Sequence, residues 1–255
     1  MIHYFLKIRE KKEEALLERL DKALVSTGRW SRKEARELVK AGRVTVEGKV
    51  ARKADEKIEE DALLAVDGEC LTHSQPTYLM LHKPAGLLSA TEDARQKTVL
   101  DLLPPHLQKL GLFPVGRLDK DTEGLLLLTD DGALAHELLS PRKHVDKVYF
   151  VRVEGILDSS DVRAFADGLV LGDGTVCMPA GLEPLETPGE GLVTLHEGKF
   201  HQVKRMLAQR GKPVTYLKRL SMGPLELDKT LGKGAWRPLT DEEIAMLWSK
   251  STKKS

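Results

Sequence analysis

The sequence GRLDKDTEGLLLLTDDG, from Gly116 to Gly132, decides the fold of the larger part of this 255-residue chain. It begins as a loop rich in charge and glycine, continues as an apolar strand at 125–129, and ends in a helix that Asp130 or Asp131 caps. The loop therefore displays acidic side chains beside a rigid sheet. Acids placed in this way fit a metal site, a general base or, most commonly, solvated turn residues, and the local sequence leaves all three open.

Further strands and helices are expected on both sides of this stretch. Apolar and alternating runs predict strands at 78–81 and 148–153, and helical periodicity predicts helices at 132–139, 160–168 and 202–211. A capping box formed by Thr240 and Glu243 begins a closing helix that ends near Trp248. Because no regular βαβ period is present, we expect an α+β fold.

The length and composition predict a globular protein of two domains. Hydrophobic residues make up 41% and charged residues 31% of the chain, and no apolar stretch approaches the roughly 20 residues of a membrane span. We therefore expect a cytoplasmic protein with no membrane partner. Cys70 and Cys177 have no CxxC partner, which argues against a zinc site or a disulfide framework and predicts two packed thiols.

The net charge of +1 conceals two basic zones. Residues 19–53 contain eleven Lys or Arg and four acids, and residues 198–225 contain seven Lys or Arg and no acid. A balanced total therefore does not exclude a nucleic-acid partner, because local patches decide such binding.

The first basic zone contains a helix followed by short strands. Ser31 and Glu34 form a capping box that begins the helix, and Gly42 ends it. Basic side chains recur at spacings of four on one face of this helix, which fits a solvated face and an RNA-binding face equally well. Strands are expected at 43–46 and 62–66.

This zone resembles the S4-type RNA-binding domain in Arg19–Leu24 (RLDKAL), in the capped basic helix and in Gly42–Gly48 (GRVTVEG). In that family the basic helix lies on folded RNA, which suits binding through phosphate contacts. The resemblance implies five RNA contacts: Arg29, Arg32, Lys33, Arg36 and Arg43. We expect an N-terminal extension at 1–17, the S4-type domain at 18–72, a linker at 73–77, a catalytic domain at 78–248 and a basic tail at 249–255.

The opening stretch, written as G-R-L-D-x-D-T-x-G-L-L-L-L-T-x-D-G, resembles the catalytic motif of RsuA-type pseudouridine synthases. Three further segments resemble motifs of that family: Lys83–Gly86 (KPAG), Lys147–Tyr149 (KVY) and Glu197–Met206 (EGKFHQVKRM). The resemblance implies a small S4-type α/β domain followed by a catalytic domain with a mixed, mostly antiparallel sheet. It also implies an isomerase that converts a uridine in ribosomal RNA to pseudouridine without a cofactor.

By resemblance, Asp119 is the catalytic residue, Tyr149 stacks on the target base and Lys204 pairs with the aspartate. The reaction breaks the N-glycosidic bond of uridine and joins C5 of the uracil to C1′. The carboxylate therefore acts either as a nucleophile or as a base on the sugar. A nearby cation favours the ionised carboxylate against the cost of burial.

Three further side chains are assigned to RNA. Arg117 is expected to fill the place that the flipped-out base leaves, and His201 and Arg205 are expected to contact RNA. We interpret His201 as an RNA contact or helix-entry residue rather than as an acid or base. The acids at 121, 130 and 131 invite a magnesium site, but helix capping explains them and we expect no metal.

Within the family, the segment HQVKRM resembles the enzyme that acts on 16S ribosomal RNA. We therefore expect 16S ribosomal RNA, or a small-subunit precursor particle, as the partner of a monomeric enzyme. The alternatives are a non-catalytic S4-type ribosome-assembly factor and a synthase that acts on 23S ribosomal RNA. An RNA methyltransferase would need a glycine-rich strand-turn-helix site, and the sequence contains no convincing one. The sequence leaves open which uridine is modified.

Overall fold

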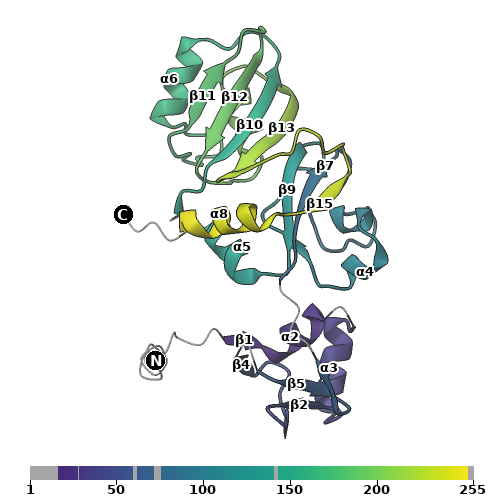
Figure 1. The fold of residues 1–255 in the computed structure, drawn as a ribbon. Helices are drawn as coiled ribbons and strands as arrows, with labels where there is room; N and C mark the ends of the chain where they lie inside the picture. Colours follow the sequence, from purple (N-terminus) through teal and green to yellow (C-terminus); the bar gives the residue numbers. More distant parts are fainter. Residues whose placement is uncertain (1–16, 28, 60–61, 72–75, 141–142, 252–255) are drawn as a thin grey trace, which may run out of the picture. The chain divides into compact units, whose positions relative to one another are not determined.

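The structure is a computed structural model that describes residues 17–27, 29–59, 62–71, 76–140 and 143–251. The chain divides into two compact units (Figure 1): unit 1 is Met1–Pro76 with Pro104–Gly111, and unit 2 is Thr77–Leu103 with Leu112–Ser255. Most of the expected extension at 1–17, most of the linker at 73–77 and the end of the tail lie outside the described residues.

Unit 1 combines short helices with two small antiparallel sheets. Its elements are β1 (Leu17–Arg19), α2 (Leu20–Ser26), α3 (Arg32–Lys40), β2 (Val44–Val46), β3 (Lys49–Val50), β4 (Lys57–Glu59), β5 (Leu64–Val66), β6 (Glu69–Leu71) and α4 (Pro105–Gln108). Strand β1 pairs with β4, and the second sheet has the order β3-β2-β5-β6. Leu20, Leu24 and Leu64 are buried at the centre of its core.

Helix α3 follows the pattern that the sequence predicts. Ser31 Oγ accepts a hydrogen bond from the Glu34 N–H, and Glu34 Oε2 accepts one from the Ser31 N–H, so the predicted capping box is confirmed. Ala35, Leu38 and Val39 form the buried face of the helix. Gly42, two residues beyond its end, has φ +70°, a left-handed conformation that favours glycine.

Unit 2 is built on one mixed sheet of nine strands with helices on both faces. Its elements are β7 (Tyr78–Lys83), η1 (Val99–Leu102), β8 (Phe113–Pro114), β9 (Glu123–Thr129), α5 (Gly132–Leu139), β10 (Lys147–Val153), α6 (Ser159–Asp167), β11 (Gly181–Pro184), β12 (Glu190–Leu195), α7 (Gln202–Gln209), β13 (Val214–Met222), β14 (Leu225–Glu226), β15 (Trp236–Pro238) and α8 (Asp241–Ser251). The strand order is β11-β12-β10-β13-β9-β7-β15, with β14 on β13 and β8 on β9. The pairings are antiparallel except between β13 and β9, so the expected α+β fold with a mostly antiparallel sheet is confirmed.

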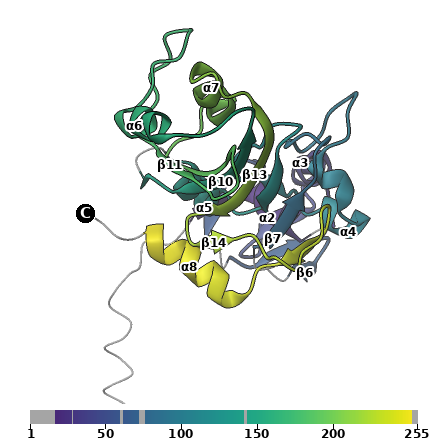
Figure 2. The same ribbon diagram turned by 90° about the horizontal axis from the view of Figure 1, so that it is seen from above.

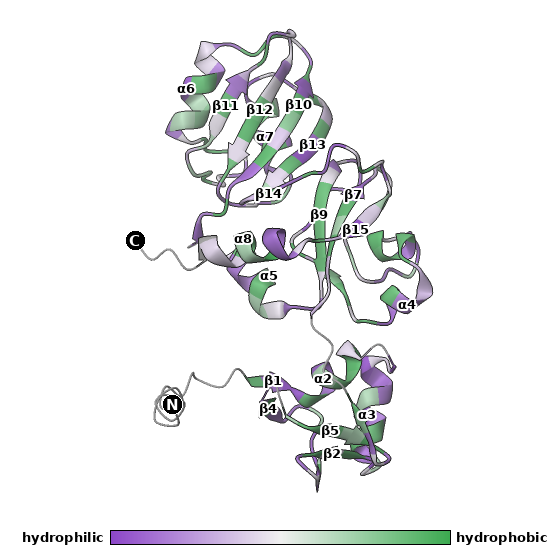
Figure 3. Ribbon diagram, in the orientation of Figure 1, coloured by the Kyte–Doolittle hydropathy of each residue, from purple (hydrophilic) through white to green (hydrophobic). Residues whose placement is uncertain are grey.

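Strands β9 and β10 differ in how the rest of unit 2 covers them. All residues of β9 are buried, as expected for a central strand covered on both faces, whereas β10 alternates between buried and more exposed residues. Figure 3 shows the same contrast, with β9 hydrophobic along most of its length. The strands predicted at 125–129 and 148–153 and the helix predicted at 132–139 are confirmed.

Helices cover the two faces of the sheet. Figure 2 shows α6 and α7 on one side of it and α8 on the other. Helix α6 packs against β11 and α7 against β13, whereas α8 packs against α5 and β14. The core that α5 and α8 form with the sheet includes Met80, Leu125, Leu134 and Leu247.

The two halves of the sheet meet where β13 runs parallel to β9. The pairing consists of Lys218 with Glu123 and Arg219 with Gly124. Gly124 has φ +108°, and a Cβ atom added to it would lie 2.2 Å from the main-chain oxygen of Arg219. Glycine is therefore required for the close approach of the two backbones.

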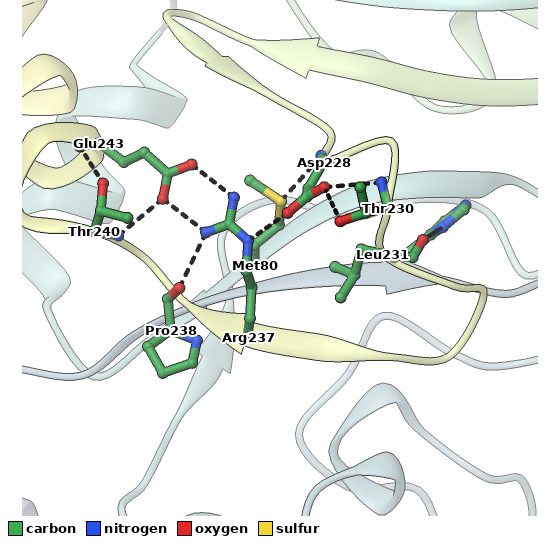
Figure 4. A network of polar contacts seen from close by, with 9 residues as sticks. Met80, Asp228, Thr230, Leu231, Arg237, Pro238, Thr240 and Glu243 are labelled. Atoms are coloured by element: carbon green, nitrogen blue, oxygen red, sulfur yellow. Dashed lines mark hydrogen bonds and ion pairs between the residues drawn. The ribbon is translucent and has the colours of Figure 1, made fainter.

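Arg237 joins the edge strand β15 to the closing helix (Figure 4). Its Nη1 and Nη2 donate to the carboxylate of Glu243 on α8, and its Nε donates to Asp228, each at 2.8 Å. Thr240 and Glu243 exchange hydrogen bonds, which confirms the second predicted capping box. Hydrogen bonds from Thr230, supported by Arg237, lower the pKa of Asp228 to about 2.

Several expectations from the sequence need correction. Strands β11, β12 and β13 were not predicted, and β5 begins at Leu64 rather than at residue 62. Cys177 is buried, but Cys70 is exposed, so the prediction of two packed thiols is wrong for Cys70. Within the ranges given above, no helix is long and apolar enough to cross a membrane.

Candidate active site

Asp119 lies in the loop between β8 and β9, and a buried lysine holds the main chain of this loop. The Lys83 ammonium, 0% exposed at the end of β7, donates to the main-chain oxygens of Asp119 (3.1 Å), Lys120 (3.2 Å) and Thr122 (2.9 Å). It also donates to the oxygen of Pro84 at 3.0 Å. Burial lowers the pKa of Lys83 to about 8, against the opposing effect of nearby carboxylates. The loop is thus fixed through its backbone.

Two further contacts hold the same loop from the segment after β7. Ser89 Oγ donates to the oxygen of Leu118 at 2.9 Å and accepts from the Leu118 N–H at 3.1 Å. The Gly86 N–H donates to the oxygen of Lys120 at 2.7 Å. These bonds, like those of Lys83, hold the loop through its main chain and do not involve the Asp119 side chain.

The Asp119 carboxylate faces the first turn of α7. Its Oδ2 lies 3.1 Å from Lys204 Nζ, and its Oδ1 lies 3.4 Å from His201 Nε2. His201 is the residue before α7 and Lys204 is in its first turn, so the positive end of the helix dipole also faces the carboxylate. The carboxylate itself is 23% exposed. The predicted pairing of Lys204 with Asp119 is thus present in the structure.

Lys204 contacts a second acid, Asp121, at 2.5 Å. Although burial opposes it, hydrogen bonding to Asp121 and Asp119 raises the pKa of Lys204 above its ordinary value. The hydrogen bond from Lys204 in turn lowers the pKa of the more exposed Asp121. Helix capping is therefore the wrong explanation for Asp121. Helix capping does explain Asp131, whose Oδ1 accepts hydrogen bonds from main-chain N–H groups in the first turn of α5.

Asp119, Tyr149 and Arg117 line one small cavity. Its volume is about 70 Å³. Tyr149 lies on β10 and is 8% exposed. The apolar part of the wall comes from Leu118, Leu195, Val203 and Leu217. Two of the three residues that the sequence assigned to catalysis, Asp119 and Tyr149, thus line this cavity, and the third, Lys204, contacts the Asp119 carboxylate.

The remaining residues assigned to RNA in unit 2 differ in their surroundings. Arg117 is exposed, and no ion pair joins it to any other described residue. Arg205 instead pairs with Asp173 at 2.6 Å and donates to the main-chain oxygen of Phe200 at 3.3 Å. His201 has φ +50°, an uncommon value for a residue other than glycine, and its ring stacks on that of Phe200.

In unit 1, two of the arginines assigned to RNA are paired with acids at the surface. Arg29 pairs with Glu69 through two hydrogen bonds, and Arg43 pairs with Asp67. Lys33 has no ion pair within the described part of the chain. The sequence did not predict these pairs, because Glu69 and Asp67 lie far from the arginines along the chain.

Arg32 and Arg36 gather with Arg19 around one buried acid, Asp21. Arg19 hydrogen-bonds both of its carboxylate oxygens at 2.9 Å, and Arg36 and Arg32 lie 3.3 and 3.9 Å from Oδ2. Although burial opposes it, Arg19 and its neighbours lower the pKa of Asp21. More than half of each α3 arginine remains exposed, so both keep a surface for an anionic partner.

Sequence reasoning missed two residues that build this site. Lys83 stands in the KPAG segment, but its contacts with a loop more than thirty residues away carry no local signal. Gly124 stands in the stretch 116–132, and its role depends on Arg219 of β13. No three His, Cys, Asp or Glu side chains converge on a possible metal position among the described residues.

Comparisons with known proteins place both parts of the chain in known families. The model of the RNA pseudouridylate synthase family matches residues 77–209, and the model of the S4 domain matches residues 18–64. The chain is 47% identical over 234 residues to an uncharacterized RNA pseudouridine synthase, YtzG, of Bacillus subtilis, with 90% of this chain and 98% of that protein covered. It is 42% identical to ribosomal small subunit pseudouridine synthase A of Pseudomonas aeruginosa and 41% identical to that of Escherichia coli, in both cases covering 89% of this chain and 98% of the relative.

A solved structure agrees as well. The crystal structure of a pseudouridylate synthase matches with a TM-score of 0.65 at 34% identity and covers 90% of this chain and 99% of that one. The synthase family model spans more than half of the chain, and the matched residues include Asp119, Tyr149 and Lys204. The chain therefore belongs to the RNA pseudouridylate synthase family.

Proposed function

We propose that this enzyme converts one uridine of 16S ribosomal RNA to pseudouridine, with Asp119 as its catalytic residue and without a cofactor. One observation carries the proposal: the Asp119 carboxylate lies 3.1 Å from the Lys204 ammonium on a cavity that Tyr149 also lines. An anion fixed beside a cation, on a cavity that an aromatic side chain also lines, suits a reaction that must hold a detached uracil and turn it.

In the proposed reaction the bond between N1 of the uracil and C1′ breaks, the uracil rotates, and a bond forms between its C5 and C1′. The hydrogen on C5 then leaves as a proton and N1 gains a proton, so the composition of the nucleoside does not change. Asp119 either attacks the sugar as a nucleophile or removes a proton from it as a base. In both routes Lys204 pairs with the carboxylate, and the backbone contacts of Lys83 keep the loop in place.

The target uridine must leave its stack in the RNA to reach the cavity, which costs a few kcal/mol. Stacking of the uracil on Tyr149 offsets part of this cost. Arg117, exposed and without an ion pair among the described residues, fills the place that the base leaves. His201 and Arg205 contact the RNA beside it.

The S4-type domain at 18–72 docks the RNA, and the catalytic domain at 78–248 carries out the reaction. Contacts with the RNA come from Arg29, Arg32, Lys33, Arg36 and Arg43. The exposed guanidinium groups of Arg32 and Arg36 support this role.

We further propose that the enzyme acts as a monomer in the cytoplasm. Two relatives at 42% and 41% identity carry the name ribosomal small subunit pseudouridine synthase A, which supports 16S ribosomal RNA as the substrate.

Tritium release from C5-labelled uridine tests the proposal. We expect the purified enzyme to release tritium from 16S ribosomal RNA, or from a small-subunit precursor particle, and Asp119→Asn to release none while still binding the RNA. Asp121→Asn is the matched control, because Asp121 lies in the same loop and contacts the same lysine. We expect this variant to retain activity.

Three outcomes contradict parts of the proposal. Equal release by wild type and Asp119→Asn would refute the role of Asp119. Release from 23S ribosomal RNA in place of 16S would show that 23S ribosomal RNA is the substrate. Binding to small-subunit RNA without release from either RNA would indicate a non-catalytic assembly factor.

A further inference from the structure

Phe200 is the most exposed large hydrophobic side chain among the described residues, with 74% of its surface accessible. It lies between β12 and α7, in the segment that leads into the catalytic lysine. Lys199 and His201, on either side of it in the sequence, line the cavity, whereas Phe200 itself does not. Its ring therefore lies outside the cavity, beside the residues that form its wall.

The ring of Phe200 is held in place from one side. It stacks on the imidazole of His201 with 3.8 Å between ring centroids and 18° between planes. The same imidazole lies 3.4 Å from the Asp119 carboxylate through its Nε2. Arg205, itself paired with Asp173, donates to the main-chain oxygen of Phe200. One face of the ring is thus covered, and the exposed surface remains for a ligand.

The basic stretch of sequence that contains Phe200 favours a nucleobase as that ligand. The residues from 198 to 225 contain seven Lys or Arg and no acid, and the core of a protein-protein interface is usually depleted of charge. Exposed aromatic rings within basic surfaces are the usual stacking sites for bases of single-stranded RNA. When a uridine is flipped out, the base next to it loses a stacking partner, and an aromatic ring just outside the cavity can replace it.

We infer that Phe200 is a stacking site for an unpaired nucleobase that neighbours the target uridine in the substrate RNA. This inference rests on the proposed function, because it requires that a flipped uridine occupies the adjacent cavity. Phe200 is then a positioning residue, since it contacts RNA outside the reacting base. It holds the RNA chain at the cavity and has no part in the bond rearrangement.

The test compares Phe200→Ala, Phe200→Leu and Phe200→Trp with wild type on an unmodified 16S ribosomal RNA transcript. Loss of one base stack should raise Kd and KM by about 5- to 150-fold in Phe200→Ala. Phe200→Leu, which is apolar but not aromatic, should resemble Phe200→Ala, whereas Phe200→Trp should bind as well as wild type. The kcat at saturating RNA should stay near the wild-type value in all three variants.

The salt dependence and a control variant separate stacking from other roles. Because stacking releases no counterions, the slope of log Kd against log salt should not change in Phe200→Ala. Ile156→Ala, which truncates another exposed apolar side chain, should leave Kd unchanged. Three results would overturn the inference: an unchanged Kd in Phe200→Ala, full recovery by leucine, or a loss confined to kcat, which would show that the ring only supports His201.

The inference and the proposed function fail in different ways. If wild type releases no tritium from either ribosomal RNA, the proposed function fails whatever the Phe200 variants do. If wild type releases tritium and Phe200→Ala has wild-type Kd and KM, only the stacking site fails.

Discussion

The Nζ atom of Lys83 lies 3.1 Å from the main-chain oxygen of Asp119. This bond joins the end of β7 to the loop that displays the Asp119 carboxylate, and the same ammonium reaches the oxygens of two other loop residues. The position of Asp119 is therefore set by a residue whose side chain is completely buried and does not line the cavity.

Lys83→Met should destabilise unit 2 and reduce activity. The substitution removes the buried donor that the main-chain oxygens of Pro84, Asp119, Lys120 and Thr122 share, which costs about 1–3 kcal/mol of unfolding free energy. Urea denaturation and kcat measure the two effects. Lys97→Met, at an exposed lysine, is the control and should change neither quantity. A Lys83→Met enzyme with wild-type stability would contradict the role of this lysine.

Lys204→Gln should lower kcat with little effect on RNA affinity. The substitution removes a charge-assisted hydrogen bond to Asp119, worth about 1.5–3 kcal/mol, so kcat should fall about 10- to 150-fold. Lys204→Arg keeps the charge and should recover part of the activity. Single-turnover kinetics on 16S ribosomal RNA measure the rate. An unchanged kcat in Lys204→Gln would show that Asp119 does not need the cation.

Gly124→Ala should destabilise the sheet where its two halves meet. The added methyl group would lie 2.2 Å from the oxygen and 2.6 Å from the nitrogen of Arg219, in a backbone conformation that disfavours alanine. We expect a loss of about 2 kcal/mol or more in unfolding free energy. Gly132→Ala is the matched control, since a Cβ there meets nothing within 4 Å and alanine favours the helix. Equal stability of the two variants would refute the close approach.

Arg32→Ala with Arg36→Ala should weaken RNA binding and flatten its salt dependence. Both guanidinium groups are largely exposed, and the slope of log K against log salt should fall by about 1 for each phosphate that the variant no longer neutralises. Unit 1 should stay folded, because Arg19 continues to hydrogen-bond both oxygens of the buried Asp21. Circular dichroism checks the fold. A slope equal to that of wild type would show that the RNA does not bind at these two arginines.

Asp228 should make the stability of unit 2 depend on pH in the acid range. Its pKa is about 2 in the folded protein and 3.8 without its partners, so the unfolded chain binds more protons between these values. The contribution of Asp228 is complete above pH 3.8 and is lost as pH falls towards 2. Asp228→Asn should therefore reduce the fall in thermal stability over this window. Glu242→Gln, which replaces an exposed acid of α8, is the control and should leave this fall in thermal stability unchanged.

The parts of the fold that neighbouring residues determine were predictable from the sequence. Ser31 with Glu34, and Thr240 with Glu243, form capping boxes within four residues, and the apolar run after Gly124 forms a buried strand. The sequence also predicted that Lys204 lies beside Asp119, because the motifs that contain them resemble those of a known family.

The parts that depend on distant residues were not predictable in this way. Asp130 and Asp131 were equal candidates for the cap of α5, and the structure assigns it to Asp131 because Asp130 bonds the Thr77 N–H instead. The second contact of Lys204, with Asp121, likewise joins residues far apart in the chain. Such pairs follow from how the strands are arranged, and no local pattern records them.

The way in which Lys83 holds the loop at 118–122 also bears on how this enzyme can evolve. Its ammonium group binds main-chain oxygens, which every amino acid carries, and so it does not depend on which side chains the loop presents. The main chain of these residues thus holds the loop, and their side chains remain available for other contacts. Mutation can explore new side chains around the aspartate, and with them new target sequences, while the loop keeps its shape.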